Sequence, residues 1–437
     1  MSKWIDRSAA CLVLAAACAA LGAQQPTAAQ PGIKLRLADA EQMAIKNNPN
    51  ISVARLLQLA QAQVTREVRS GELPTATGDL TAVGAHDNTR ITAGLLNNPS
   101  VYDRAAGGLD VSQLITDFGR THRLILSAKS NAQAQLDAER ATEQDITLAV
   151  DQAFYHALSA QAVLMVAQET VAERQATDEE INALTAAKLR STLDLSFADV
   201  ELSQAKLLLL DAQTANQATM ADLNALLGSE SDQQYVLVDE TPPNPQVAPD
   251  DAEGMVKVAF GSRPDLASLM DSATAARQYS AAEHDLWRPT VSALAAVGGT
   301  PVRADQIASS WYGAAGADIQ IPLFNGFLYN ARAREADLRS NAAQEQVRNM
   351  RDSIARDVRN AVLNAQAAFQ RIGVTHEMLN QSNMALNLAQ TRYKIGLSGI
   401  VELSQAQLAQ TQAEIAYANA RYAYQTALAE VRFQTGQ

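Results

Sequence analysis

Cysteine is almost absent from this chain of 437 residues, and both examples, Cys11 and Cys18, lie near the amino terminus. Without further cysteine, the rest of the chain has no disulfide framework and no thiol chemistry. Long apolar runs are missing too: after Leu21 no stretch reaches about 18 apolar residues, the length that a spanning helix needs. The sequence therefore predicts no transmembrane helix.

Residues that serve catalysis or bind cofactors are also missing in any recognisable pattern. No two of the five histidines have the spacing of metal ligands, and there is no phosphate-binding loop and no nucleophile elbow. We therefore expect no metal, no cofactor and no catalytic residue, and hence no enzyme. The net charge of −12 argues against a nucleic-acid partner, because such partners are bound by basic patches.

The first 23 residues have the pattern of a secretory signal peptide. Lys3 and Arg7 form a short positive region, residues 9–21 are apolar, and small residues follow. Cys18 comes after three alanines and loosely resembles a lipoprotein cleavage box, although a leucine is more usual three residues before the cysteine. Two readings stay open: a signal peptide of residues 1–23, or a lipoprotein signal that ends before a lipidated Cys18.

The chain is internally repeated. Asn48-Pro49 returns as Arg263-Pro264, and Pro74 returns as Pro289, both 215 residues later. Beyond Asp110 the offset is 208, as in the match of Ile146, Val150, Ala153 and Ala157 to Ile354, Val358, Ala361 and Ala365, and of Gly228 to Gly436. One offset held over such a length indicates two copies of one unit.

We place the first copy at residues 34–228 and the second at residues 250–437. The segment 229–249 between them is a linker whose prolines exclude a regular helix. Asp250 or Asp251 is expected to cap the helix that opens the second copy.

Each copy has the pattern of a short helix, a proline step, a second helix, two strands and a very long helical stretch. Neither glycine nor proline occurs from Arg120 to Leu227. The steps of four, three and four from Ile146 to Ala157 are those of a coiled-coil seam. A helix from Phe118 to Lys188 would reach roughly 105 Å at 1.5 Å per residue, which is far longer than a globular helix.

The expected strands are residues 75–83, 107–115, 290–297 and 311–321. In the last of them, Trp311 and Ile319 fall on an apolar face, while Asp318 and Gln320 fall on the other face with small residues. Strict alternation is typical of a barrel strand that faces lipid on one side and a polar lumen on the other, and Asp110 and Ser112 repeat the polar face. A soluble hairpin packed on the helices is the alternative.

Four strands cannot close a barrel, and open edges are not tolerated in lipid. If these strands span a membrane, the chain must therefore oligomerise, and three chains would supply twelve strands. The turn-rich segments 85–106 and 298–310 would be loops outside the barrel.

These features together resemble the outer membrane efflux protein family, the TolC-like channels, over nearly all of the mature chain. The segments that carry the resemblance are NNPNISVAR, SRPDLASLM, SQLITDFGR, IQIPLFNGF and RYKIGLSGIVELSQAQL. The resemblance implies a mainly α fold with a membrane β-barrel, built from tandem repeats. It further implies a homotrimer with a twelve-stranded barrel and a long coiled-coil α-helical barrel in the periplasm. Because Phe327 stands where the family often has glycine, as at Gly119, we expect a less regular second turn from strand into helix.

The resemblance also implies a gate at the periplasmic tip. Glu402 falls where the family has an acidic residue at the closed entrance, and Asp194 is its counterpart 208 residues earlier. In a trimer these carboxylates would form a ring that attracts cations. Gln405 lies at a second position that is often acidic in the family, so a second ring would be weaker. The alternative for all three is that they are solvated residues near a hairpin tip.

Tyr393 matches a family tyrosine that helps to hold the entrance shut by hydrogen bonding. The arginine that would pair with it falls at Ser398, which puts this lock in doubt, but Arg190 at the equivalent place in the first copy could substitute.

The predicted function is the outer-membrane exit duct of a tripartite efflux pump, which conducts small molecules from the periplasm to the exterior. Its partners would be a periplasmic adaptor protein and an inner-membrane pump. One alternative is the channel of a type I protein secretion system, and another, from a different class, is a periplasmic coiled-coil adaptor or scaffold. The predicted location is the outer membrane, with an extension into the periplasm.

Overall fold

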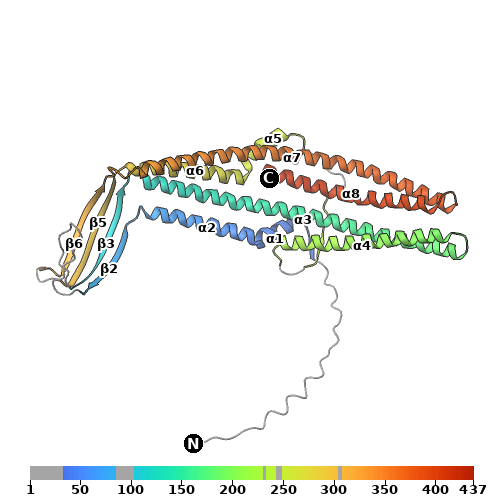
Figure 1. Ribbon diagram of the computed structural model, residues 1–437, viewed down its shortest axis with the longest axis horizontal. Helices are drawn as coiled ribbons and strands as arrows, with labels where there is room; N and C mark the ends of the chain where they lie inside the picture. The colour runs from blue at the N-terminus through green and yellow to red at the C-terminus, as the bar shows by residue number, and fades with distance from the viewer. Residues whose placement is uncertain (1–32, 85–102, 230–232, 243–248, 304–307) are drawn as a thin grey trace, which may run out of the picture.

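In the computed structural model the described residues are 33–84, 103–229, 233–242, 249–303 and 308–437. The predicted signal peptide and Cys18 lie outside them. The molecule is elongated: four strands form one end, and paired helices run from them to two hairpin tips at the other end (Figure 1). The carboxyl terminus lies near the middle of the length.

Both halves of the chain have the same order of helices and strands, which confirms the tandem repeat. The first half contains α1 (Leu37–Asn47), α2 (Pro49–Ser70), β2 (Thr75–Val83), β3 (Arg104–Thr116), α3 (Arg120–Ala186) and α4 (Thr192–Leu226). The second half contains α5 (Ala252–Ser262), α6 (Pro264–His284), the 3₁₀ turn η1 (Asp285–Trp287), β5 (Thr290–Val302), β6 (Trp311–Gln320), α7 (Leu328–Lys394) and α8 (Ile400–Thr435).

The long helices α3 and α7 are equally long at 67 residues, and each spans about 100 Å at 1.5 Å per residue. Each runs from the sheet to a hairpin tip, where α4 or α8 returns beside it (Figure 1). Alanine is the most frequent residue at their buried positions, as at Ala157 and Ala365, which are fully buried. Small side chains let the helices approach closely, which explains how the chain folds with so few aromatic residues.

The turns from strand into long helix correct one expectation. The second turn is not less regular than the first, because both use two consecutive residues in the left-handed region. Phe118 and Gly119 have φ of 56° and 103°, and Gly326 and Phe327 have φ of 64° and 65°. Glycine is the second residue of the pair in the first turn and the first residue of the pair in the second turn. A phenylalanine in the left-handed region is costly, so the surrounding contacts must hold both turns in this shape.

At each proline step, Asn48-Pro49 and Arg263-Pro264, the chain bends between two helices, and we call this bend a corner. The returning helices α4 and α8 end against these corners. Asn48 is buried, caps α2 by accepting a hydrogen bond from Asn50 N at 2.9 Å, and donates one to the Leu226 carbonyl at 3.0 Å. A Cβ atom on Gly228 would lie 2.7 Å from the Asn47 carbonyl oxygen, and one on Gly436 would lie 2.8 Å from the Ser262 carbonyl carbon. Both glycines also have positive φ. Glycine therefore occupies both of these equivalent positions, because a side chain there would clash with the backbone of the corner.

The strands form one antiparallel sheet in the order β2-β3-β5-β6. β3 and β5 extend beyond their predicted limits, while β2 is as predicted and β6 ends one residue early. Register places Thr77 beside Asp110, Asp110 beside Ala296, and Ser292 beside Asp318 on one face. Leu80, Val297 and Ile319 lie on the other face and are exposed. The sheet therefore has one polar and one apolar face, as the alternation predicts.

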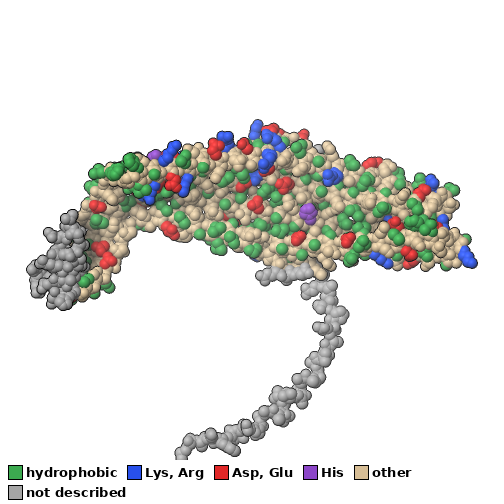
Figure 2. All heavy atoms as spheres, in the orientation of Figure 1, with side chains coloured by type: hydrophobic (Ala, Val, Ile, Leu, Met, Phe, Trp, Pro, Cys, Tyr) green, Lys and Arg blue, Asp and Glu red, His purple; other side chains and the backbone are tan. Residues whose placement is uncertain are grey.

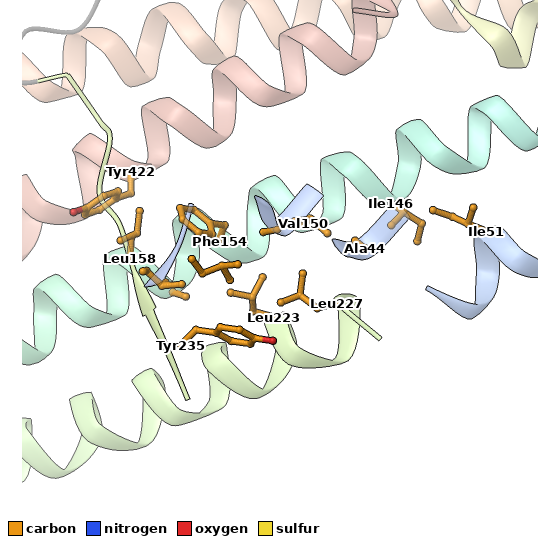
Figure 3. Packing of buried hydrophobic residues seen from close by; sticks show 14 residues of the cluster. Ala44, Ile51, Ile146, Val150, Phe154, Leu158, Leu223, Leu227, Tyr235 and Tyr422 are labelled. Carbon is orange, nitrogen blue, oxygen red and sulfur yellow. The ribbon is translucent and has the colours of Figure 1, made fainter. Parts of the chain in front are cut away.

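A second, parallel sheet joins β1 (Ile33–Leu35) to β4 (Tyr235–Leu237). β4 lies in the segment 229–249, where no strand was expected from the sequence. Leu35 and Tyr235 pack with Val150, Phe154 and Leu223 in the largest apolar cluster, shown in Figure 3. β1 is thereby tied to the middle of the helical part.

Within these residues, no helix combines the length and the apolar character needed to cross a membrane.

Candidate gate at the tips of the helical hairpins

The two tips are built by turns at equivalent places. In the first, Lys188 takes the left-handed conformation with φ of 59°; in the second, Gly396 does so with φ of 77°. Ser191 caps α4 by accepting from Leu193 N at 3.1 Å, and the Asp194 carboxylate accepts from Ser191 N at 3.4 Å. The second tip has Gly399 in the capping position, with no side chain to cap α8. Asp194 therefore has a structural role in this cap, and its role in the gate stays a prediction.

An apolar cluster joins the two tips. It draws on all four helices of the hairpins and contains Ile181, Ala198, Leu386, Tyr393, Ile400 and Leu403. The sequence analysis did not predict this cluster. The repeat could have pointed to it, because Ile181 is equivalent to Ala389 and Ala198 to Ala406, each 208 residues later. Burial of these side chains holds the hairpins together within one chain.

The structure brings Arg190 and Tyr393 together, but not through the tyrosine hydroxyl. Arg190 Nη2 donates to the Tyr393 carbonyl oxygen at 2.8 Å, and its guanidinium carbon lies 4.2 Å from the centre of the tyrosine ring. The hydroxyl itself is buried and has no hydrogen-bond partner among the described residues. Burial raises the pKa of Tyr393, nearby Arg190 opposes that rise, and Asp194 adds to it. This contact links the first tip to the second by a cation–π interaction and one backbone hydrogen bond.

The other predicted residues lie close to these tips, in varied surroundings. Glu402 is exposed and pairs with Arg392 of its own hairpin, with Nε and Oε1 3.2 Å apart. Gln405 is exposed on α8. The Ser398 hydroxyl is buried without a partner in the described part of the chain. The charge of Glu402 is thus partly offset in a single chain, and that of Asp194 is engaged in its cap.

Further charged groups line the first hairpin just behind its tip. Arg174 is buried, with only 3% of its surface exposed, and its Nε lies 4.0 Å from Glu201. Burial lowers the pKa of Arg174. Burial also raises the pKa of Asp178, and the charge of Asp199 on the facing helix adds to this effect. No sequence pattern singled out these residues.

No cluster of three or more potential metal ligands occurs within the described ranges. On the visible face, acidic and basic side chains are interspersed along the helical part (Figure 2).

The sequence profile of the outer membrane efflux protein family matches residues 41–229 and 255–437, which is most of the chain and both of its halves. The chain belongs to this family. It is therefore an efflux protein of the outer membrane, from a family of transport ducts rather than of enzymes.

Relatives of this efflux protein include OprJ of Pseudomonas aeruginosa, which is 24% identical over 395 residues, covering 89% of this chain and 81% of OprJ. The outer membrane protein TolC of Salmonella enteritidis is 24% identical over 121 residues, which are 28% of this chain and only 25% of TolC. Among solved structures, the outer membrane protein VceC of Vibrio cholerae has a TM-score of 0.78 at 20% identity, covering 92% of this chain and 96% of VceC. The CmeC outer membrane channel of Campylobacter jejuni has a TM-score of 0.79 at 16% identity, covering 92% and 85%. These likenesses confirm the predicted fold.

Proposed function

We propose that the efflux protein is one protomer of a homotrimeric exit duct that accepts small molecules from a periplasmic adaptor and an inner-membrane pump. The observation that carries this proposal is the open four-stranded sheet. Its two outer strands, β2 and β6, have free edges in the described chain, and one of its faces is apolar and exposed. Such a sheet is stable in lipid only when further strands close it into a barrel.

The polar face of the sheet supports a water-filled lumen. Thr75, Thr77, Asp110 and Ser112 line a hollow of the sheet, together with Val111, Leu294 and small residues of β5 and β6. Three copies would supply twelve strands with these polar side chains inward and Leu80, Val297 and Ile319 outward. The helical hairpins would then extend the lumen into the periplasm.

At the far end, Asp194 and Glu402 would approach their copies around the threefold axis and form the entrance ring, with Gln405 as a neutral neighbour. Like charges in a narrow mouth attract cations. The apolar cluster and the contact of Arg190 with Tyr393 hold the two hairpins of each chain together, so opening requires the hairpins to separate at these contacts.

Conductance in planar bilayers tests the proposal. The wild-type protein should insert as a trimer and conduct with a preference for cations, and Asp194→Ala with Glu402→Ala should lower this preference by about twofold or more. Asp39→Ala with Asp250→Ala removes two exposed carboxylates away from the tips and is the matched control, expected to keep the preference. A protein that gives no channels at all would refute the duct, and an unchanged preference would refute the ring.

A further inference from the structure

A block of four glycines lies in the two central strands of the sheet. Gly107 and Gly108 are neighbours in β3, and Gly298 and Gly299 are neighbours in β5. Register pairs Gly107 with Gly299 and Gly108 with Gly298. Glycine weakens the interior of a strand and often marks a place where another group approaches closely. The block therefore predicts a close neighbour on at least one face of the sheet.

On the polar face, this neighbour is Tyr312 of β6. Register puts Gly108, Gly298 and Tyr312 in one row across three strands, and Asp79 of β2 continues the row. Because successive side chains of a strand alternate between its faces, Gly108 shares the face of Asp110, two residues later. The row therefore belongs to the polar face, on which the tyrosine is its largest side chain.

The Tyr312 side chain lies along this row, over both glycines. A Cβ atom on Gly298 would lie 2.5 Å from Tyr312 Cζ, and one on Gly108 would lie 3.2 Å from the same atom. Both added atoms would also collide with the tyrosine hydroxyl oxygen. The side chain thus extends sideways across β5 towards β3 instead of standing up from the sheet, and it is 40% exposed.

Gly108 is the glycine of the block that Tyr312 explains best. A Cβ atom on Gly107 would lie 2.8 Å from Leu80 Cδ2 on the apolar face, and one on Gly298 would lie 2.6 Å from the Gly107 carbonyl oxygen. At Gly108 the next contact after the tyrosine is the Val297 carbonyl oxygen at 2.9 Å. A methyl group at position 108 would therefore mainly displace the tyrosine.

The repeat supplies a glycine with the opposite surroundings. Gly108 comes two residues before Asp110, and Gly316 comes two residues before Asp318, so the two glycines are equivalent. A Cβ atom on Gly316 would meet no atom within 4 Å. The equivalent glycine is thus covered by an aromatic side chain in the first half and is open in the second.

The row crosses the sheet towards the end that is farther from the helices. Tyr312 is the second residue of β6, whose other end leads to α7, and Gly108 lies in the first half of β3, which leads to α3 (Figure 1). In the proposed duct this is the exit end of the barrel, and three copies place three tyrosines around the lumen. Rings that stood up from the wall would narrow the exit, whereas rings that lie flat leave it wide.

We infer that Tyr312 determines the largest solute that the exit admits, and that Gly108 keeps the exit wide because it lets the ring lie flat against the wall. The inference rests on the proposed duct and adds a residue that determines solute size. Pore diameter is one of the properties by which channels select what they conduct. A side chain at position 108 would lift the ring into the path of the solute.

The size of reagent that reaches a cysteine below this row tests the inference. Thr77→Cys is the reporter, because Thr77 is exposed on the polar face, two residues nearer to α2 than Asp79. Both native cysteines lie in the first 18 residues, and the chain without Thr77→Cys gives the background. Intact cells are treated from outside with a small charged maleimide or with a maleimide that carries a polyethylene glycol chain, and the ratio of the two labelling rates is measured.

Gly108→Ala should lower the ratio of large-reagent to small-reagent labelling by about threefold or more, because the lifted ring narrows the exit. Gly316→Ala adds the same methyl group at the equivalent position without touching Tyr312, and it is the matched control, expected to keep the ratio. Adding Tyr312→Ala to Gly108→Ala should restore the ratio. A ring that only stabilised the sheet would give no such restoration.

Tyr312→Ala alone keeps the question decidable if Gly108→Ala fails to fold. A flat ring occupies little of the lumen, so the ratio should change by less than about 1.5-fold. A threefold rise would mean that the ring already stands in the lumen and would overturn the inference. So would an unchanged ratio in folded Gly108→Ala, or a double variant that stays low. If even the small maleimide fails to label Thr77→Cys above background, the proposed duct itself is contradicted.

Discussion

The two halves of the chain share one backbone and differ in side-chain chemistry. Helices α3 and α7 have the same length, and both follow a pair of residues with positive φ. Yet Phe118-Gly119 in one half is Gly326-Phe327 in the other, and Lys188 in one tip is Gly396 in the other. The comparison teaches that the repeat keeps the backbone geometry of its corners and tips, while the residues that stabilise this geometry have changed.

The corners show the same divergence. Asn48 holds its corner with one buried amide. Arg263 holds the other by two bonds to Asp265, at 3.0 and 2.6 Å, and by a bond to Gln434, with its guanidinium 5.4 Å from the Phe433 ring. The glycine that abuts each corner has not changed, because no side chain fits there.

The largest effect is expected at these glycines. Gly228→Ala and Gly436→Ala each add a Cβ atom within 3.0 Å of backbone atoms and force alanine into the left-handed region. We expect each to lower the free energy of unfolding by about 2–4 kcal/mol, from overpacking together with backbone strain. Gly396→Ala has positive φ but open space around it, so it should cost only about 1–2 kcal/mol. Thermal melting in detergent, followed by circular dichroism, measures all three, and equal losses would contradict the role of the corners.

The next effect is a pH dependence at the joint between α1 and α3, which the equivalent joint of the second half should not share. Asp151 on α3 is buried, and its pKa is raised to about 7, first by burial and then by the hydrogen bond and charge of Glu41 on α1, with Arg432 of α8 opposing. The equivalent residue of the second half is Arg359, which pairs with Glu253 of α5 at 2.8 Å. The contact between α1 and α3 thus has two acidic residues, Glu41 and Asp151, and the contact between α5 and α7 has an acidic and a basic one, Glu253 and Arg359.

Because the folded pKa of Asp151 is raised, the folded state binds a proton more tightly than the unfolded state does. Its stabilising contribution is complete below the unfolded pKa of about 4 and is lost as the pH rises through about 7. Between pH 5 and pH 8 the protein should lose on the order of 2–4 kcal/mol at this joint. Asp151→Asn should flatten the dependence of the melting temperature on pH, whereas Arg359→Gln should leave it in place. An unchanged slope in Asp151→Asn would contradict the assignment.

The smallest effect concerns the tips. Arg190 of the first tip has no arginine counterpart in the second, because the equivalent residue there is Ser398. Arg190→Ala removes the bond to the Tyr393 carbonyl and the cation–π contact, and we expect a loss of about 1–2 kcal/mol with a higher open probability in bilayers. Tyr393→Phe removes only a hydroxyl that has no hydrogen-bond partner among the described residues, so stability and gating should change by less than about 0.5 kcal/mol. A large effect of Tyr393→Phe would show that the hydroxyl forms part of the lock.

The sequence predicted the repeat, the long helices and the alternating strands, because each leaves a local and periodic trace. It also named both partners of the contact between Arg190 and Tyr393, which the structure forms through the tyrosine carbonyl and ring. It missed the pairing of β1 with β4 and the apolar cluster at the tips. Strands of three residues are too short for an alternating pattern to be recognised, and the cluster draws one or two residues from each of four helices, in two hairpins that lie far apart in the chain.

By itself, the sequence determined the elements and their duplication, because helix and strand periods, prolines and glycines act on neighbouring residues. Only the tertiary structure decided which copies of these elements touch. It gave α6 two long neighbours and α2 one, and it left β2 and β6 as the edges of the sheet in the described part of the chain. Contacts of this kind depend on the direction in which distant segments return, and no local pattern records that direction.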